Sequence, residues 1–291
     1  MDIKGKRILV TGDNGFVGRH LVERLKQKGA EVIILKDIDG YRIDVRDWQK
    51  IKNLAIVDII YHLAGITHTP FSLVNPREIY EVNVLGTINM LELSRLHNVE
   101  KLIFASSYVY GHPQYLPIDE KHPIEPTSPY ARSKVLAEQL CYSYSKDFGV
   151  KYIILRCFNI YGEGQNEDFL IPLIVKQLRI GKIELEDPEP KRDFVYISDV
   201  INAYIESGSF DGDSETFNIG YGKSYSVKGI VDKVIQLRGR YIEVNYRNNR
   251  RKNEIMNTVA DISKAKDKLN WKPMVSIEEG LNKMIEATRE V

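Results

Sequence analysis

Residues 7–18, with the sequence RILVTGDNGFVG, decide the fold expected for this chain of 291 residues. The first five residues form a short apolar run and predict a buried strand. Gly12, Gly15 and Gly18 follow that strand directly, and the pattern at 15–28 predicts a helix. Glycines at such a junction let the backbone turn tightly and approach a pyrophosphate, to which the helix N-terminus offers free N–H groups. The stretch therefore predicts a dinucleotide-binding loop rather than an ordinary turn.

Strand and helix patterns continue to alternate along the first half of the chain. Further strands are predicted at 31–35, 58–63, 101–106 and 151–156, and further helices at 76–96 and 128–147. Asn75 and Ser128 are the expected N-caps of these two helices, and Pro129 the first helical residue of the second. This order predicts an α/β fold with a Rossmann-type doubly wound parallel sheet, covered by helices on both faces.

The alternation changes from about Gly162 onward. Helices near 171–179, 227–238 and 277–288 are separated there by short extended pieces, while a helix at 198–207 and a strand at 216–219 are expected to return to the main sheet. We therefore expect a dinucleotide-binding domain of residues 1–161 plus 195–220. Residues 162–194 plus 221–291 are expected to form a smaller mixed α/β C-terminal domain that binds the substrate.

Composition excludes several classes of function. The 41 basic and 40 acidic side chains give a net charge of +1, so the chain lacks the overall positive charge of a nucleic-acid-binding protein. Two cysteines are too few for a disulfide framework, and the six histidines show no metal-ligand spacing. No apolar run reaches the roughly 20 residues of a membrane span, and the N-terminus lacks the apolar region of a signal peptide. We expect a cytoplasmic protein with no nucleic-acid partner, no membrane and no metal.

The end of the second predicted strand is where the ribose of a dinucleotide is usually held by an acidic residue. Asp37 lies 19 residues after Gly18, but Lys36 stands between it and the strand. A lysine there can instead pair with the 2′-phosphate of NADP. Asp44 is a second acidic candidate for the adenosine end. Adjacent strand residues point to opposite faces, so geometry decides, and NAD held by Asp37 is the expected outcome.

A phenol and an ammonium lie four residues apart, at Tyr130 and Lys134, on one face of the helix predicted at 128–147. A free phenol has a pKa near 10 and is a poor base at neutral pH. A cation at about 4 Å contributes roughly 4 kcal/mol at an effective dielectric near 20, which brings a phenolate within reach of physiological pH.

The same spacing recurs at Tyr142 and Lys146, 12 residues further along the helix, so both pairs cannot serve one site. Tyr130 is favoured because it begins the helix. Ser106, moreover, ends a predicted strand at the sheet edge where ligands bind.

Eight motifs now stand in order: TGDNGFVG at 11–18, HLAG at 62–65, NVLGT at 83–87, SSYVYG at 106–111, SPYARSK at 128–134, LRCFNIYG at 155–162, RDFVYISDV at 192–200 and FNIG at 217–220. Together they resemble the extended short-chain dehydrogenase/reductases, in the NAD-dependent epimerase/dehydratase branch that acts on nucleotide-activated sugars. The resemblance covers essentially the whole chain. Each motif alone is weak evidence for the family, but eight motifs in the expected order are specific to it.

The resemblance implies that Tyr130 is the acid/base, that Lys134 is its electrostatic partner and a ribose ligand, and that Ser106 donates to the reacting oxygen. It implies tightly bound NAD, with NADP as the alternative, held by Gly12, Asn14, Gly15, Phe16, Val17, Gly18, Lys36, Asp37, Asp44, Val45, Leu63, Ala64, Gly65, Asn83, Tyr130, Lys134 and Cys157. It implies a nucleotide-diphosphate sugar as the substrate, contacted by Ser106, Ser107, Tyr108, Tyr130, Asn159, Arg192 and Arg251.

Three departures from the family pattern reduce the number of reactions that this chain is expected to catalyse. Lys36 stands where members that use NAD usually carry aspartate. Ser107 and Tyr108 replace the Asp–Glu pair of the sugar 4,6-dehydratases, which disfavours water elimination. The stretch EDPEPKRD at 186–193 lacks the glycines common in UDP-sugar 4-epimerases.

The leading hypothesis is NAD-dependent 4-epimerisation of a nucleotide sugar of the UDP-glucose/UDP-galactose kind, through a transient 4-keto intermediate. An NADP-dependent reductase of nucleotide-4-keto-sugars is the alternative, and a non-catalytic dinucleotide sensor is the third hypothesis.

The stretches 84–96 and 135–144 carry more apolar and aromatic side chains than one sheet-facing stripe requires. Because the corresponding helices pair across a two-fold axis in the resembling family, we expect a homodimer.

Overall fold

The computed structural model describes residues 3–37 and 39–287, which fall into two compact units. The first unit comprises Met1–Gly111, Pro123–Cys157 and Ile201–Phe217. The second comprises His112–His122, Phe158–Val200 and Asn218–Val291. Both units are therefore discontinuous in sequence. The ligand that each unit binds stays a prediction.

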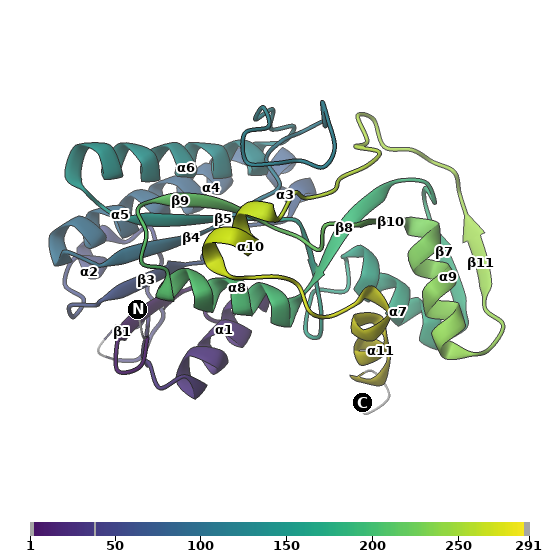
Figure 1. The fold of residues 1–291 in the computed structure, drawn as a ribbon, viewed down its shortest axis with the longest axis horizontal. Coiled ribbons are helices and arrows are strands. Elements are labelled where there is room, and N and C mark those ends of the chain that lie inside the picture. The colour runs from purple at the N-terminus through teal and green to yellow at the C-terminus, as the bar shows by residue number, and fades with distance from the viewer. Residues whose placement is uncertain (1–2, 38, 288–291) are drawn as a thin grey trace. The chain divides into compact units, whose positions relative to one another are not determined.

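A six-stranded sheet in the order β2-β1-β3-β4-β5-β9 forms the centre of the first unit (Figure 1). Its strands are β1 (Arg7–Thr11), β2 (Glu31–Ile34), β3 (Ile59–His62), β4 (Lys101–Ser107), β5 (Tyr152–Cys157) and β9 (Glu215–Ile219). The neighbouring pairs from β2 through β5 are parallel. Strands β1, β3, β4 and β5 are apolar and almost wholly buried, as expected for strands covered on both faces. The α/β class predicted from the strand–helix alternation is confirmed.

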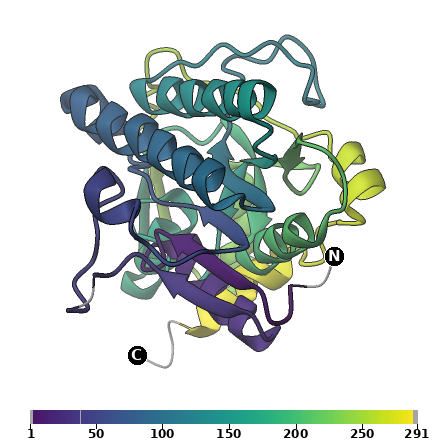
Figure 2. The ribbon, with the colours of Figure 1, turned by 90° about the vertical axis from the view of Figure 1, so that its left-hand side faces the viewer.

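Helices cover both faces of this sheet. The helices along this part of the chain are α1 (Phe16–Gln27), α2 (Trp48–Ile51), α3 (Thr69–Val74), α4 (Pro76–Tyr80), α5 (Gly86–His97), α6 (Pro129–Phe148) and α8 (Ile197–Ser209). Helices α5 and α6 pack on β3, β4 and β5, whereas α1 packs on β1 and β2. Figures 1 and 2 show α5 and α6 over one face of the sheet and α1 over the other.

The helix predicted at 76–96 differs from a single α-helix. A π-helical turn, η1 (Glu81–Leu85), separates α4 from α5, and such turns are frequent at functional sites. Asn75 is the N-cap residue of α4, as predicted, but its side chain makes no capping hydrogen bond. Ser128 does cap α6 by accepting the Ala131 N–H at 3.1 Å, and Pro129 is the first helical residue.

The second unit holds two small sheets. Strands β6 (Asn159–Tyr161), β8 (Lys191–Tyr196) and β10 (Ser224–Ser226) form one in the order β10-β8-β6, and β7 (Lys182–Leu185) pairs with β11 (Glu243–Tyr246). The helices are α7 (Leu170–Ile180), α9 (Val227–Arg238), α10 (Ser263–Leu269) and α11 (Ile277–Ala287). The predicted end of the last helix, residue 288, lies outside the described residues. Within 3–37 and 39–287, no helix is long and apolar enough to cross a bilayer.

Candidate cofactor and catalytic site

The loop after β1 follows a backbone path that requires glycine at two positions. Gly12 has a φ of +72°, and a Cβ there would lie 2.7 Å from the Ala64 backbone nitrogen. A Cβ on Gly18 would lie 2.0 Å from the Gly12 carbonyl oxygen. Gly15 is the N-cap of α1 and is exposed, so the N–H groups of the first helical turn remain open. These residues fit a dinucleotide pyrophosphate.

This loop lies at the point where the order of the strands reverses. Strand β2 pairs with one side of β1 and β3 with the other, and ligands of open parallel sheets bind at the carboxyl ends of strands at such a point. The segment from Leu63 to Gly65 follows β3 at the same edge. Its Ala64 N–H donates to the Thr11 hydroxyl at 3.1 Å.

The buried side chain of His62 links the strand ends beside the glycine loop to helix α5. The Nδ1 of His62 lies 2.8 Å from the Thr11 hydroxyl and its Nε2 lies 3.1 Å from the Thr87 hydroxyl. Burial, reinforced by the Lys134 ammonium, lowers the pKa of His62 to about 3. His62 is therefore neutral and holds β3 to β1 and α5.

Asn83 lies on the π-helical turn and holds the segment that follows β3. Its Oδ1 accepts the Ile66 N–H at 2.8 Å, and its Nδ2 donates to the Ile66 carbonyl at 3.1 Å and to the Ser133 hydroxyl at 2.9 Å. All three bonds join Asn83 to backbone and side chains of the site. Its position fits the supporting role that the resemblance implies.

The acidic residues expected at the adenosine end are engaged by the chain itself. Asp37 accepts the Tyr41 N–H at 2.8 Å and lies 3.5 Å from the Lys50 ammonium. The Asp44 carboxylate accepts from the backbone and the guanidinium of Arg46, which lowers the pKa of Asp44. Both carboxylates therefore have partners within the chain.

A basic residue outside the set predicted from the sequence lies against the glycine loop. Arg42 donates to both Asp13 oxygens, at 2.6 and 2.9 Å, and its backbone forms a bridge with Lys36. Lys36 is exposed. No sequence signal marks Arg42, because its distance from the loop depends on the turn that brings residues 36 and 42 together.

Tyr130 lies in the first turn of α6. Its phenol is hydrogen-bonded to Ser107 at the end of β4. Burial raises the pKa of Tyr130, while the Ser107 hydrogen bond lowers it and the Cys157 thiol raises it. The net shift is upward, opposite to the lowering expected from Lys134, because burial is the largest cause and the groups that act on this phenol are Ser107 and Cys157. Ser106 faces elsewhere and donates to the buried Glu138 carboxylate at 2.5 Å. The structure thus brings Ser107, and not the predicted Ser106, to the phenol.

The Lys134 ammonium is buried beneath the segment after β3. It donates to the Ala105 carbonyl at 2.8 Å and lies 4.8 Å from the centre of the Phe104 ring. A Cβ on Gly65 would lie 3.3 Å from Nζ. Burial lowers the pKa of Lys134 to about 8, against the opposing effect of Glu138. Lys134 therefore remains largely protonated at neutral pH.

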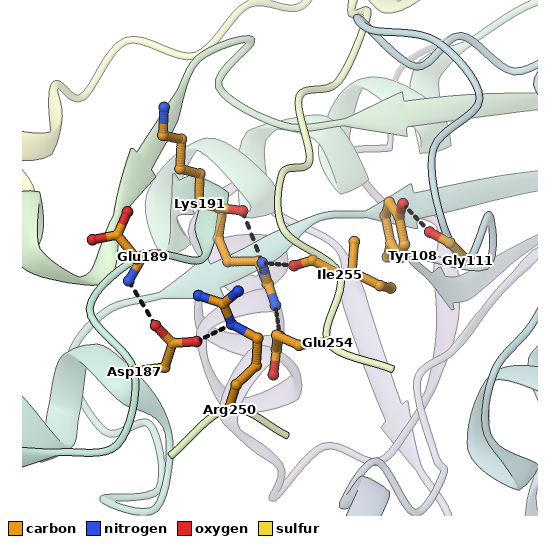
Figure 3. A network of polar contacts seen from close by, with 9 residues as sticks. Tyr108, Gly111, Asp187, Glu189, Lys191, Arg250, Glu254 and Ile255 are labelled. Carbon is orange, nitrogen blue, oxygen red and sulfur yellow. Dashed lines mark hydrogen bonds and ion pairs between the residues drawn. The ribbon is translucent and has the colours of Figure 1, made fainter. Parts of the chain in front are cut away.

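Cys157, another predicted residue of the first unit, pairs in register with Ser107. Burial raises the pKa of its thiol to about 12, so it is a neutral thiol and not a nucleophile. The predicted substrate contact Tyr108 donates its hydroxyl to the Gly111 carbonyl at 2.6 Å, as Figure 3 shows.

The predicted diphosphate ligands belong to the second unit. Arg192 donates to the Ile255 carbonyl at 2.5 Å and forms an ion pair with Glu254. Figure 3 shows Arg250 paired with Asp187, at 2.6 Å. Asn159 and Arg251 are exposed. In the part of the chain that the structure describes, no group of three His, Cys, Asp or Glu side chains could hold a metal ion.

Comparison with known proteins agrees with this architecture. The profile of the NAD dependent epimerase/dehydratase family matches residues 8–220. This chain belongs to that family. It is therefore an enzyme of a nucleotide-sugar-modifying family whose members bind NAD or NADP, and its predicted family is confirmed.

Individual relatives span nearly the whole chain. A Methanocaldococcus jannaschii protein, provisionally named a UDP-glucose 4-epimerase, is 36% identical over 300 residues, covering 96% of this chain and 97% of its own. A Thermotoga maritima UDP-glucose 4-epimerase, solved with UDP-glucose, has a TM-score of 0.92 and 29% identity over 98% of this chain and 99% of its own. RMD from Pseudomonas aeruginosa, solved with NADPH, has a TM-score of 0.89 and 28% identity over 97% of this chain and 98% of its own.

Proposed function

We propose that this chain catalyses the NAD(P)-dependent 4-epimerisation of a nucleotide-activated sugar of the UDP-glucose/UDP-galactose kind. The observation that carries the proposal is a phenol, a hydroxyl and an ammonium at one edge of the sheet, next to the glycine loop. Tyr130 and Ser107 are hydrogen-bonded to each other, and Lys134 lies under Gly65. Gly12 packs on the neighbouring Ala64, which connects the catalytic groups to the proposed pyrophosphate site.

In this proposal, Tyr130 takes the proton of the sugar 4-hydroxyl and later returns it. Ser107 hydrogen-bonds the same oxygen as its charge changes, which takes over the role predicted for Ser106. Lys134 supplies the positive charge that favours the phenolate. The dinucleotide, when bound, supplies the hydride acceptor and donor at C4. Because burial raises the pKa of Tyr130 in the protein alone, the Ser107 hydrogen bond and the Lys134 charge are needed to make the phenol an effective base.

The second unit is proposed to bind the nucleotide diphosphate through Asn159, Arg192 and Arg251. Arg192 is held by Glu254 and by the Ile255 carbonyl. An anionic diphosphate would have to compete with Glu254 for this guanidinium, because both are acceptors for the same donors. We therefore propose that Glu254 sets the orientation of Arg192 before substrate binds.

A 4-ketoreductase that uses NADPH is the second candidate, and the adenosine end favours it. Two cations, Lys36 and Arg42, lie at the turn beside the glycine loop, and Arg42 is bonded to Asp13 of that loop. Asp37, the expected ribose ligand, is bonded to Tyr41 and Lys50 instead. Cations at this turn can pair with the 2′-phosphate of NADPH.

The cofactor retained by the purified protein separates these functions. An epimerase is expected to carry close to one NAD per chain and to interconvert a 4-epimeric pair of UDP-, dTDP-, GDP- or CDP-sugars. A ketoreductase is expected to arrive largely empty and to oxidise added NADPH in the presence of a 4-keto sugar. Cofactor binding with no turnover of any sugar would contradict both and favour a sensor.

A further inference from the structure

The Glu138 carboxylate is buried in the first unit and is bonded from two strands. Arg156 reaches it from β5, with Nη2 at 2.6 Å and Nε at 3.0 and 3.2 Å. Ser106 donates to it from β4 at 2.5 Å. Arg156 also donates to the Tyr110 hydroxyl at 3.0 Å and lies over that ring. A buried ion pair gains about as much as it loses in hydration, so stability alone is a weak reason for this cluster.

The cluster of Glu138, Arg156 and Ser106 is connected to the catalytic groups through helix α6 and the end of strand β4. Positions 130, 134 and 138 lie on one face of α6, because residues four apart are stacked along a helix. These side chains hold three consecutive residues at the end of β4: Lys134 bonds the carbonyl of residue 105, Glu138 bonds Ser106, and Tyr130 bonds Ser107. One helix face therefore fixes the strand end at three successive positions.

The two serines point to opposite faces of the strand, as neighbouring strand residues do. In the register of β4 and β5, Ser106 lies opposite Arg156 and Ser107 lies opposite Cys157. The Ser106 hydroxyl is thus held on the Glu138 side while the Ser107 hydroxyl reaches the phenol. Any rotation of the strand end that frees Ser106 must also turn Ser107 away from Tyr130.

We propose that Glu138 is a positioning residue, which acts through Ser106 and Arg156 to hold the Ser107 hydroxyl against the Tyr130 phenol. This inference rests on the proposed function in treating the Tyr130–Ser107 pair as catalytic. Glu138 itself is too deeply buried to contact a sugar, and its carboxylate is already bonded by Ser106 and Arg156. It follows Tyr130 by eight residues, so the signal in the sequence is a carboxylate two turns along the catalytic face.

Glu138 also contributes to the charge state of Lys134. The titratable groups that act on this ammonium are Glu138 and Cys141 from α6 and Cys157 from β5, while His62 of β3 also interacts with it. Of these four, Glu138 has the largest effect that raises the pKa of Lys134, while burial raises the pKa of both thiols and keeps His62 neutral. The Glu138 carboxylate opposes the loss of the lysine proton that burial favours.

The test uses Ser106→Ala, which removes the link to β4 but leaves the Glu138–Arg156 ion pair intact. Its matched control is Ser94→Ala, a buried serine whose hydroxyl donates to the Met90 carbonyl within α5 at 2.8 Å. The Tyr130 titration is followed by NMR of ¹³C-tyrosine-labelled protein and identified with Tyr130→Phe. Because the Ser107 hydrogen bond lowers the pKa of Tyr130, Ser106→Ala is expected to raise that pKa.

In the same variant, kcat should fall about tenfold with KM unchanged, as expected when a catalytic group is misplaced without loss of substrate contacts. Ser94→Ala should change neither the titration nor kcat. Glu138→Gln should reproduce the effects of Ser106→Ala. If it fails to fold because Arg156 is left unpaired, Ser106→Ala decides alone.

The proposal is wrong if Ser106→Ala leaves both the Tyr130 titration and kcat at the values of Ser94→Ala. The titration requires no substrate, so it is independent of the proposed reaction. A raised Tyr130 pKa in Ser106→Ala, in a protein that turns over no nucleotide sugar, would support the positioning role of Glu138 and overturn the proposed function.

Discussion

The Tyr130 phenol is hydrogen-bonded to Ser107, whereas the adjacent Ser106 donates its hydroxyl to Glu138. Both serines end the same strand, but they serve opposite faces of it. The hydroxyl that shares a substrate oxygen with Tyr130 is therefore expected to be that of Ser107. The two serines are expected to contribute to catalysis separately. Ser107 would act through direct contact with the substrate oxygen, and Ser106 through the position of the strand end.

Replacing Ser107 with alanine tests the direct contact. We expect Ser107→Ala to lower kcat by about 10²-fold, because a positioned donor to the reacting oxygen is lost. The loss should exceed that of Ser106→Ala measured with the same substrate. Steady-state kinetics of the two variants side by side would decide, and a larger effect at Ser106 would restore the assignment made from the sequence.

Tyr130→Phe should remove the acid/base while leaving the glycine loop intact. We expect turnover to fall by about 10²–10⁴-fold and the dissociation constant of the dinucleotide to change by no more than a few-fold. Tyr142→Phe is the matched control: Tyr142 is 61% exposed on the same helix, so its variant should behave as wild type. Retention of most activity by Tyr130→Phe would rule out the assigned base.

The cofactor preference depends on the charges beside the glycine loop. If the chain uses NAD, Lys36→Asp should change NAD affinity little. If the wild type prefers NADPH and Lys36→Asp weakens its binding by tenfold or more, the expected NAD preference is wrong and the ketoreductase becomes the better proposal. Lys146→Asp is the control, since it makes the same charge reversal at an exposed residue in the last turn of α6. Calorimetric titration with each dinucleotide measures the affinities directly.

Acid should destabilise the fold through His62. The folded-state pKa of His62 is about 3, below the ordinary value near 6.5, so the unfolded chain takes up a proton that the folded chain excludes. Its contribution to stability is full above pH 6.5 and is lost as the pH falls toward 3. The free energy of unfolding should drop by about 2 kcal/mol between pH 7 and pH 5 from this group. Urea denaturation of wild type and His62→Gln should show a smaller drop in the variant, and equal drops would contradict the prediction.

The predicted homodimer can be tested at the exposed apolar side chains of α5 and α6. Leu96 is 48% exposed and Leu136 is 42% exposed. We expect wild type to show twice the mass of one chain by light scattering at micromolar concentration, and Leu136→Lys to show the mass of one, because the charge would be buried in a self-complementary interface. Met274→Lys, at an apolar residue of the second unit that is 68% exposed, should leave the mass unchanged. A wild-type mass equal to that of one chain would contradict the predicted homodimer.

The sequence alone determined the order of the main elements and the principal ligand loop. The inner strands of the main sheet are apolar runs, and apolar residues at helical spacing alternate with them, so local pattern was sufficient to place β1 through β5 and α1, α5 and α6. Glycine spacing marked the loop at 12–18 because only glycine fits the close backbone approach found there. The four-residue spacing of Tyr130 and Lys134 is enough to place both on one helix face, because a helix repeats every 3.6 residues.

Only the tertiary structure decided how neighbouring polar residues are used. Local pattern does not state which of two adjacent serines faces the helix, since that depends on the register of β4 against β5 and on the partners across it. The engagement of Asp37 by Tyr41 and Lys50, and of Asp13 by Arg42, likewise arises from contacts between segments separated in sequence. The pKa of Tyr130 follows from burial by the whole unit, and burial is a property of packing in three dimensions rather than of residue spacing.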